Sequence, residues 1–282
     1  MHRILIAVLA LALPALADAQ VSALKKIRDG KTVTIAYRTN ALPFSFKDKD
    51  GKPAGYTVEL CKRVIESMGA RLKLSELNVK WVEATSESRF ELIEKGSADM
   101  ECGATTATLK RMERVDFSSY VFVDSTGVLV RAASGVKQFG ELNGKRIAVI
   151  RATTAVDAIG RALRLSGQTA EVVEYPSRDE ALAALESEKA DAFVSDKILL
   201  AGLAGKVKDR SKYLLLEDDL SIEPYAIMLP RGDSGLRLEV NRALSRVFSS
   251  RVIQQIFEGT FGRDIEPSPL LIAVYQIGQI PD

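Results

Sequence analysis

Short apolar runs that end in polar residues recur along the chain, and two of them match each other closely. The segments DGKTVTIAYRTN (29–40) and NGKRIAVIRATT (143–154) both carry Gly-Lys at their start. Each continues as a run rich in Val and Ile, which is typical of a buried strand, and ends in an arginine followed by hydroxyl or amide side chains. We therefore predict one strand in each segment, with polar groups at its carboxyl end.

A second matched pair follows later in each half. FELIEKGSADMECGATT (90–106) and LAALESEKADAFVSDKI (182–198) each have the period of a short amphipathic helix, then a turn ending in Ala-Asp, then an apolar strand. Polar residues begin four residues after each Asp, at Gly103 and at Ser195. Many α/β proteins repeat strand, turn and helix, but two matched pairs in the same order favour a duplicated unit.

The matched pairs predict an α/β protein built as two lobes of similar construction. Ligands of open α/β sheets bind at the carboxyl ends of the strands, so a ligand would lie in the cleft between the lobes. The apolar segments 125–132 and 224–232 would cross between the halves, and two crossings make a hinge that allows closure. The predicted boundaries are 20–125 with 226–282 for lobe 1, and 126–225 for lobe 2.

The C-terminal part of the chain has the pattern of helices. Apolar residues recur at helical spacing over 233–262. They are Leu236, Val240, Leu244, Val247, Ile253 and Phe257. We expect helices here that belong to lobe 1.

The first 19 residues have the pattern of a secretory signal peptide. Arg3 precedes an apolar run at 4–13, and Ala17-Asp18-Ala19 forms an A-x-A cleavage pattern before Gln20. The run is too short to span a bilayer well. We predict removal of residues 1–19 and a periplasmic location.

Composition excludes several classes of function. Charged residues make up 27% of the chain and leave a net charge of +2, without a basic block, so we expect no binding of nucleic acid. The single histidine is His2, which lies in the predicted signal peptide. Histidine-based catalysis and most zinc sites are therefore not expected, and we predict no metal and no cofactor.

Cys61 and Cys102 are the two cysteines of the chain. Export to an oxidising compartment would permit a disulfide between them. Both could instead be small buried apolar residues, one in a helix and one at the end of a strand, and the pattern favours this second interpretation.

Three segments carry a resemblance to a known family: YRTNALPFSFKDKDGKPAGYTVELCKRV, SESRFELIEKGSADMECGATTATLKRMERVDFSSYVFV and IRATT. They resemble extracellular solute-binding proteins of family 3, the soluble receptors of polar amino-acid ABC transporters, and within that family the glutamate/aspartate-binding branch. The resemblance implies a type II periplasmic-binding-protein fold, with two lobes joined by two hinge strands. It also implies a monomer that delivers its amino acid to an ABC permease in the inner membrane.

The resemblance implies how the backbone groups of an amino acid are bound. The helix start at Thr106 and the guanidinium of Arg111 correspond to the α-carboxylate site, and Thr154 of the second lobe would bond the same carboxylate. Asp196 would pair with the α-ammonium group. The chemistry is consistent, because a helix N-terminus and an arginine both favour an anion.

Further positions correspond to the recognition of the ligand side chain. Arg38, Arg89 and Ser86 match contacts to a distal carboxylate in the acidic amino-acid branch. Arg178 stands where that branch usually has a histidine, and a third guanidinium would increase the demand for an anion. Without the resemblance, Arg38 and Arg89 would be interpreted as solvated surface residues.

Two departures from the branch affect the pocket. Ala104 replaces a common serine, so a hydroxyl contact is lost while a backbone contact can remain. Arg151-Ala152 replaces Ser-Gly before the two threonines, and Arg151 would either point into solvent or crowd the cleft.

Two other functions fit the same fold. A periplasmic enzyme similar to cyclohexadienyl dehydratase would need a general acid in the cleft, for which Glu59, Glu87 and Glu101 are candidates. A soluble input module of a sensor would share the ligand site and differ in its partner surface. We predict a binding protein for glutamate or aspartate that performs no chemistry on its ligand.

Overall fold

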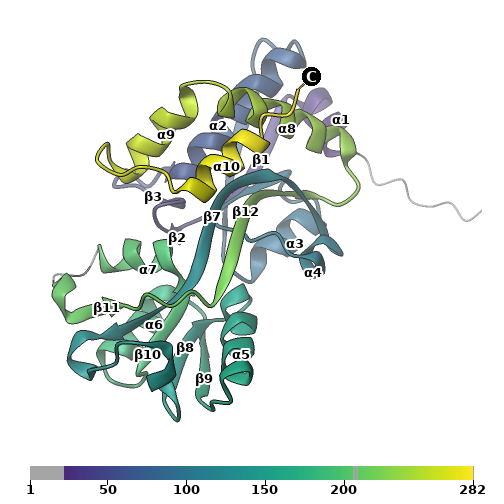
Figure 1. Cartoon of the computed structure of the whole chain (residues 1–282). Coiled ribbons are helices and arrows are strands. Elements are labelled where there is room, and N and C mark those ends of the chain that lie inside the picture. The colour runs from purple at the N-terminus through teal and green to yellow at the C-terminus, as the bar shows by residue number, and fades with distance from the viewer. Residues whose placement is uncertain (1–21, 206, 208, 282) are drawn as a thin grey trace, which may run out of the picture.

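The computed structural model describes residues 22–205, 207 and 209–281, so the predicted signal peptide at 1–19 lies outside the described residues. Figure 1 shows two α/β lobes, which we call lobe 1 (upper) and lobe 2 (lower). Two long strands, β7 (Val115–Arg131) and β12 (Ser221–Pro230), run between the lobes and pair with each other antiparallel. The prediction of a two-lobed α/β protein with two hinge strands is confirmed.

The strands form one large sheet that passes through both lobes, in the order β5-β1-β6-β12-β7-β10-β8-β9, with β11 also paired to β7. The strands not yet given are β1 (Thr32–Arg38), β5 (Asn78–Ala84), β6 (Met100–Cys102), β8 (Arg146–Ile150), β9 (Glu171–Tyr175), β10 (Ala192–Asp196) and β11 (Tyr213–Leu215). A separate small sheet consists of β2 (Asn40–Ala41), β3 (Ser45–Lys47) and β4 (Pro53–Ala54).

The internal repeat of the sequence is visible in this topology. In lobe 1, β1 lies between β5 and β6 and is parallel to both. In lobe 2, β8 lies between β9 and β10 and is parallel to both. The matched segments 29–40 and 143–154 therefore supply the middle strand of each parallel trio, and their carboxyl ends face the cleft.

Helices cover the sheet in both lobes (Figure 1). Lobe 1 has α1 (Ala23–Gly30), α2 (Tyr56–Arg71), α3 (Ser88–Glu94), α4 (Leu109–Met112), α8 (Ser234–Phe248), α9 (Val252–Phe261) and α10 (Pro269–Ile277). Lobe 2 has α5 (Thr154–Ser166), α6 (Arg178–Glu186) and α7 (Lys197–Ala204). Short 3-10 turns occur at η1 (Ala132–Ser134), η2 (Phe139–Leu142) and η3 (Arg210–Lys212). The helical pattern predicted for 233–262 corresponds to α8 and α9.

The hinge strands begin earlier than the sequence predicts. The predicted crossing at 125–132 is only the second half of β7, which starts at Val115 because its first half pairs with β12 from Val115 opposite Pro230 onward. Ser118 and Ser119 interrupt the apolar pattern there, so the sequence conceals this part of the strand. The predicted lobe boundaries at 125/126 and 225/226 fall within β7 and β12 and stay a prediction.

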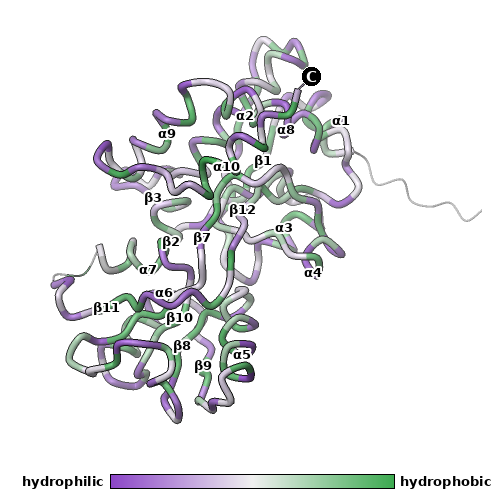
Figure 2. The backbone as a smooth tube through the Cα atoms, in the orientation of Figure 1, coloured by the Kyte–Doolittle hydropathy of each residue, from purple (hydrophilic) through white to green (hydrophobic). Residues whose placement is uncertain are grey.

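Each lobe has its own hydrophobic core, and the strands in the middle of each lobe are mostly hydrophobic in Figure 2. In lobe 1, Phe44 contacts aromatic rings of both hinge strands, with centroids 4.8 Å from Phe122 and 5.1 Å from Tyr225. Aromatic pairs in this geometry add to the energy of burial. The hinge strands are therefore anchored firmly in lobe 1, next to the cleft.

The structure corrects the interpretation of the cysteines. Cys61 on α2 and Cys102 at the end of β6 form a disulfide, with their Cα atoms 6.4 Å apart. Both residues are fully buried in the core of lobe 1, as expected, but the interpretation as two separate apolar side chains is wrong. The reason is that α2 packs directly over β6, which brings the two positions within bonding distance.

Candidate ligand-binding site

The expected binding residues lie where strands of both lobes end at the cleft. Arg38 is the last residue of β1, and Ala104 and Thr106 follow β6. In lobe 2, Thr154 begins α5 after β8, and Asp196 is the last residue of β10. Because the parallel strands of each lobe point their carboxyl ends at the cleft, residues far apart in sequence are brought together there.

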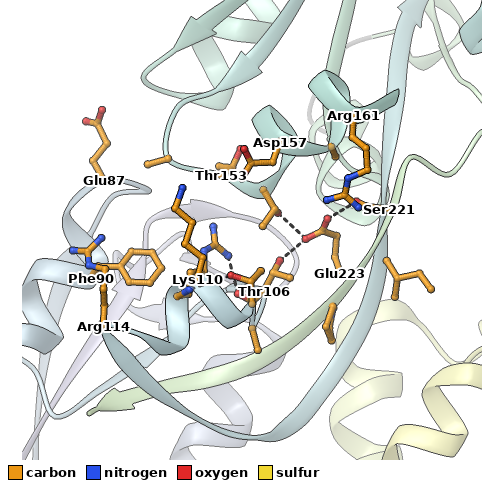
Figure 3. A pocket seen from close by; sticks show the side chains of 18 residues that line it. Glu87, Phe90, Thr106, Lys110, Arg114, Thr153, Asp157, Arg161, Ser221 and Glu223 are labelled. Atoms are coloured by element: carbon orange, nitrogen blue, oxygen red, sulfur yellow. Dashed lines mark hydrogen bonds between the residues drawn. The ribbon is translucent and has the colours of Figure 1, made fainter. Parts of the chain in front are cut away.

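Arg111, Thr106 and Thr154 form one end of the site. Arg111 Nη1 donates to the carbonyl oxygen of Thr106 at 2.7 Å. The hydroxyls of Thr106 and Thr154 donate to the same oxygen, Oε2 of Glu223, at 2.5 and 2.6 Å. Figure 3 shows Glu223 reaching from the hinge strand toward Thr106. Thr106 and Thr154 come from different lobes, so this carboxylate joins the lobes at the hinge.

Glu223 is a functional candidate that the sequence did not reveal. Its side chain is 2% exposed, and its Oε1 also accepts from the hydroxyls of Thr126 and Ser221. Burial of a carboxylate is costly unless donors compensate it, and these hydroxyls do so. The available signal was a charged residue inside the otherwise apolar hinge strand SIEPYAIMLP.

Three arginines form the opposite, distal end of the site, which we call the distal arginine cluster: Arg38, Arg89 and Arg178. All three are buried, and Arg38 Nη2 donates to Ser86 Oγ at 2.9 Å. Arg89 Nη2 donates across the cleft to the carbonyl oxygen of Ala152 at 3.2 Å. Burial lowers the pKa of each guanidinium. The pKa of Arg38 falls to about 9, because the positive charge of Arg178 adds to the effect of burial. Arg38 thus remains charged at neutral pH.

The distal arginine cluster holds donors that nothing in the described protein uses. Nε of Arg38, Nε of Arg89, and both Nε and Nη1 of Arg178 have no hydrogen-bond partner among the described residues. Buried polar groups in native proteins are nearly always paired. These N–H groups are therefore the part of the site best suited to an anionic ligand.

Glu101 lies beside the cluster and is completely buried. Burial raises the pKa of its carboxyl group, whereas Arg89 and Arg38 act to lower it. The side chain fits because position 103 is glycine, since a Cβ there would lie 2.1 Å from Glu101 Oε1 and 2.9 Å from Arg38 Cγ. This close approach explains why a small residue must follow the strand at Gly103.

Asp196 lies in a network of acidic groups at the hinge. Its Oδ2 accepts a hydrogen bond from the hydroxyl of Tyr225, and Asp124 Oδ2 lies 3.4 Å from the same hydroxyl. Burial raises the pKa of both carboxyl groups, helped by Glu223 for Asp196 and by Asp196 for Asp124. Tyr225 and Asp124 on the hinge strands were not identified from the sequence, where neither residue stands out.

A cavity of about 730 Å³ opens between the lobes beside Arg111. Thr106, Arg111 and Thr154 line it, and Figure 3 shows Lys110, Arg114 and Arg161 around the same space. The distal arginine cluster and Asp196 are buried and do not line this cavity. The structure therefore divides the expected residues into an open end at Arg111 and an enclosed end at the arginines.

The departures from the expected pattern can now be placed. Arg151 Nε lies 3.5 Å from Glu87 Oε1, and both side chains are about half exposed, so Arg151 neither crowds the cleft nor points freely into solvent. Ala104 is 9% exposed. Of the three glutamates considered as general acids, Glu59 pairs with Lys62 on α2, Glu87 lines the cavity and pairs with Arg151, and Glu101 is the buried one.

Within the described residues, no group of three or more His, Cys, Asp or Glu side chains is arranged to hold a metal ion. The same part of the chain contains no helix with the length and apolar character needed to cross a membrane. The candidate site offers hydrogen bonds and charge, with arginines at both ends and carboxylates between them.

The chain is similar to known proteins over most of its length. The L-glutamate/L-aspartate-binding protein of Pseudomonas aeruginosa is 31% identical, over 92% of this chain and 86% of its own length. The ABC transporter glutamine-binding protein of Bacillus subtilis is 26% identical over 83% of both chains. The fold matches a histidine-bound substrate-binding protein of an ABC uptake transporter from Streptococcus pneumoniae, with a TM-score of 0.77, 21% identity and coverage of 88% of this chain and 99% of that one. Residues 33–263 match the bacterial extracellular solute-binding proteins of family 3, and the chain belongs to that family.

Proposed function

We propose that this protein is the periplasmic receptor of an amino-acid ABC importer and that it binds an acidic amino acid, such as glutamate or aspartate, between its lobes. The observation that carries the proposal is the distal arginine cluster, whose buried N–H groups have no partner among the described residues. A ligand with a negatively charged side chain supplies the missing acceptors.

The backbone groups of the ligand would be bound at the other end. Arg111 provides a guanidinium for the α-carboxylate, and the hydroxyls of Thr106 and Thr154 lie beside it. In the proposed complex these hydroxyls turn from Glu223 toward the ligand. Asp196 pairs with the α-ammonium group, and the backbone at Ala104 offers a further contact.

The side chain of the ligand would enter the distal arginine cluster. Arg38 is held by Ser86 of the same lobe, so its guanidinium is positioned before a ligand arrives. Arg89 bonds the carbonyl oxygen of Ala152 in the opposite lobe, so the closed form would complete its position. Preorganised partners reduce the entropy lost on binding. Arg178 adds a third positive charge, from lobe 2.

The proposed lobes are 20–125 with 226–282, and 126–225, and they would close about β7 and β12. Removal of residues 1–19 would release the protein into the periplasm as a monomer. The closed, loaded form would then dock on a permease in the inner membrane.

A binding role is also favoured over an enzyme with this fold. The family and the named relatives are binding proteins. Incubation with glutamate, aspartate and prephenate followed by product analysis should show no conversion; turnover of any of them would support the enzyme.

The experiment that tests the proposed ligand is a thermal-shift screen of the mature protein against the common amino acids and dicarboxylates. A ligand that binds only the folded state raises the melting temperature according to its affinity. Glutamate or aspartate should give the largest shifts among the amino acids. A larger shift with glutamine or arginine, both compatible with the family, would reject the acidic assignment.

A further inference from the structure

One aromatic ring contacts arginines from both ends of the candidate site. The guanidinium carbon of Arg89, in the distal arginine cluster, lies 5.0 Å from the centroid of the Phe90 ring. The guanidinium carbon of Arg111, at the opposite end, lies 5.3 Å from the same centroid. Both distances are typical of a cation–π contact, in which the negative face of the ring attracts a positive charge. Phe90 thus touches both ends of the site.

The ring of Phe90 is anchored in lobe 1. Phe90 lies on α3, is 6% exposed, and belongs to a hydrophobic cluster that includes Ala107, Phe117 and Met228. The residue also lines the cavity, where Figure 3 shows its ring beside Arg114. A side chain that is close-packed in a core is held in place, so its ring can support the groups that contact it.

The two guanidiniums have few other restraints. Among the described residues, the guanidinium of Arg89 donates to the carbonyl oxygen of Ala152, and that of Arg111 donates to the carbonyl oxygen of Thr106. Burial lowers the pKa of Arg89, and the positive charges of Arg38 and Arg111 add to this effect. These arginines therefore repel one another, and the negative face of the ring offsets part of that repulsion.

We propose that Phe90 is a positioning residue of the binding site, whose ring holds Arg111 for the α-carboxylate and Arg89 for the side chain of the ligand. This inference rests on the proposed function, because it takes both arginines as ligand contacts. Arg114 also lies over the ring, at 5.2 Å from the centroid. Its two hydrogen bonds to Glu94, of 2.6 and 2.7 Å, fix it independently of the ring. The ring therefore acts on binding through Arg111 and Arg89.

The test replaces Phe90 with phenylalanines that carry one, two and three fluorine atoms on the ring. Fluorine withdraws negative charge from the face of the ring in steps and changes its size little. Calorimetric titration with L-glutamate should show an affinity that falls at each step, by about tenfold in total. The affinity for L-glutamine should fall less, because this ligand engages Arg111 but brings no carboxylate to Arg89. A role in packing alone would not follow the charge of the ring.

Phe117 is the matched control, since it lies in the same cluster and is also 6% exposed, whereas the arginines described above lie over Phe90. The same replacements at Phe117 should leave both affinities unchanged. The inference is overturned, and the proposed function left intact, if fluorination of Phe90 does not weaken glutamate, or weakens it no more than glutamine or than fluorination of Phe117 does. Failure of the wild type to bind glutamate or aspartate would reject both. If the trifluorinated variant does not unfold cooperatively on heating, the first two steps decide.

Discussion

In the proposed site, Arg38 and Arg89 bind the side chain of the ligand. Arg111 and Asp196 bind the α-carboxylate and α-ammonium groups, which all amino acids share. Loss of a hydrogen bond to a charged group costs about 1.5–3 kcal/mol, and about 1.4 kcal/mol corresponds to tenfold in affinity. We therefore expect Arg38→Ala or Arg89→Ala to weaken glutamate and aspartate by at least about tenfold, and glutamine and asparagine much less. Calorimetric titration with all four ligands measures this difference.

The amides are the appropriate control because they preserve the size of the ligand and remove its charge. Arg111→Ala is the matched variant, and it should weaken acids and amides alike. If Arg38→Ala and Arg89→Ala also weaken both kinds of ligand equally, these arginines do not recognise the distal carboxylate, and the acidic assignment fails.

Substitution of Glu101 should strengthen the binding of acidic ligands, whereas substitution of Arg38 or Arg89 weakens it. The buried carboxylate of Glu101 opposes the positive charge of Arg38 and Arg89, so Glu101→Gln should bind acidic ligands more tightly relative to their amides. We expect the glutamate-to-glutamine affinity ratio to rise by up to about tenfold, which corresponds to about 1.4 kcal/mol. The same substitution should lower the melting temperature of the unliganded protein, because three buried arginines lose a counter-charge.

Titration of wild type and Glu101→Gln with glutamate and glutamine separates this charge effect from a purely structural one. A structural role alone would weaken both ligands in parallel. A glutamate-to-glutamine affinity ratio identical to that of wild type would show that the charge of Glu101 does not act on the site.

At the scale of elements, the meeting of β7, β10 and β12 predicts a dependence of binding on pH. Asp124, Asp196 and the hydroxyl of Tyr225 lie together there, and the pKa of each carboxyl group is raised, mainly by burial. Asp196 must be ionised to pair with an ammonium group. Ligand affinity should therefore fall, and proton release on binding should rise, as pH decreases from about 8 to about 5.

The effect on stability has the opposite direction. A carboxyl group with a raised pKa stabilises the unliganded fold below the ordinary pKa of about 4, and this contribution is lost as pH rises through the folded-state value. The increase in melting temperature caused by the ligand should therefore grow with pH. Asp124→Asn removes a negative neighbour of Asp196. The loss of ligand affinity at low pH should therefore begin at a lower pH in this variant than in the wild type. An unchanged profile would show that the pair does not control binding.

The elements also show what the sequence could predict. The Gly-Lys strands (β1, β8) and the strands after the Ala-Asp turns (β6, β10) were predicted, because apolar runs reflect local burial. The third strand of each parallel trio, β5 or β9, was not predicted. Glu223 was not predicted, although it is a charged residue in an apolar strand, and Asp124 gave no signal, since the contacts of both arise only where strands distant in sequence meet beside the cleft. The disulfide was missed for a related reason: the spacing of Cys61 and Cys102 does not reveal that α2 packs over β6.

The family resemblance supplied most residues of the candidate site, and the structure added the hydrogen bonds between them. Thr106, Thr154 and Arg111 were expected to surround a carboxylate, and the two threonines instead donate to Glu223 in the structure. This is consistent with the expectation in chemical terms, because the hydroxyls are bound to an anion. Glu223 and the α-carboxylate of a ligand would therefore compete for the two threonine hydroxyls. No pattern of residues indicated this competition.

At the scale of the whole molecule, contacts among the described residues connect the two proposed lobes: Thr106 to Glu223, Arg89 to the carbonyl oxygen of Ala152, and Arg151 to Glu87. The first two are the stronger candidates for holding the lobes together, because they are buried or part-buried hydrogen bonds that involve charged groups. The third is exposed, and such ion pairs contribute about 0–1 kcal/mol.

These contacts predict that ligand closes the protein about its two hinge strands. Small-angle scattering should give a smaller radius of gyration with saturating glutamate than without it, because bound ligand replaces water between the charged ends of the cleft. Arg151→Ala should close normally, since the exposed pair with Glu87 adds little. Arg89→Ala should close less completely with any ligand, because it loses the bond to the backbone of lobe 2 as well as the contact with the ligand. An unchanged radius in wild type at saturation would contradict hinge closure and would require the ligand to enter an already closed site.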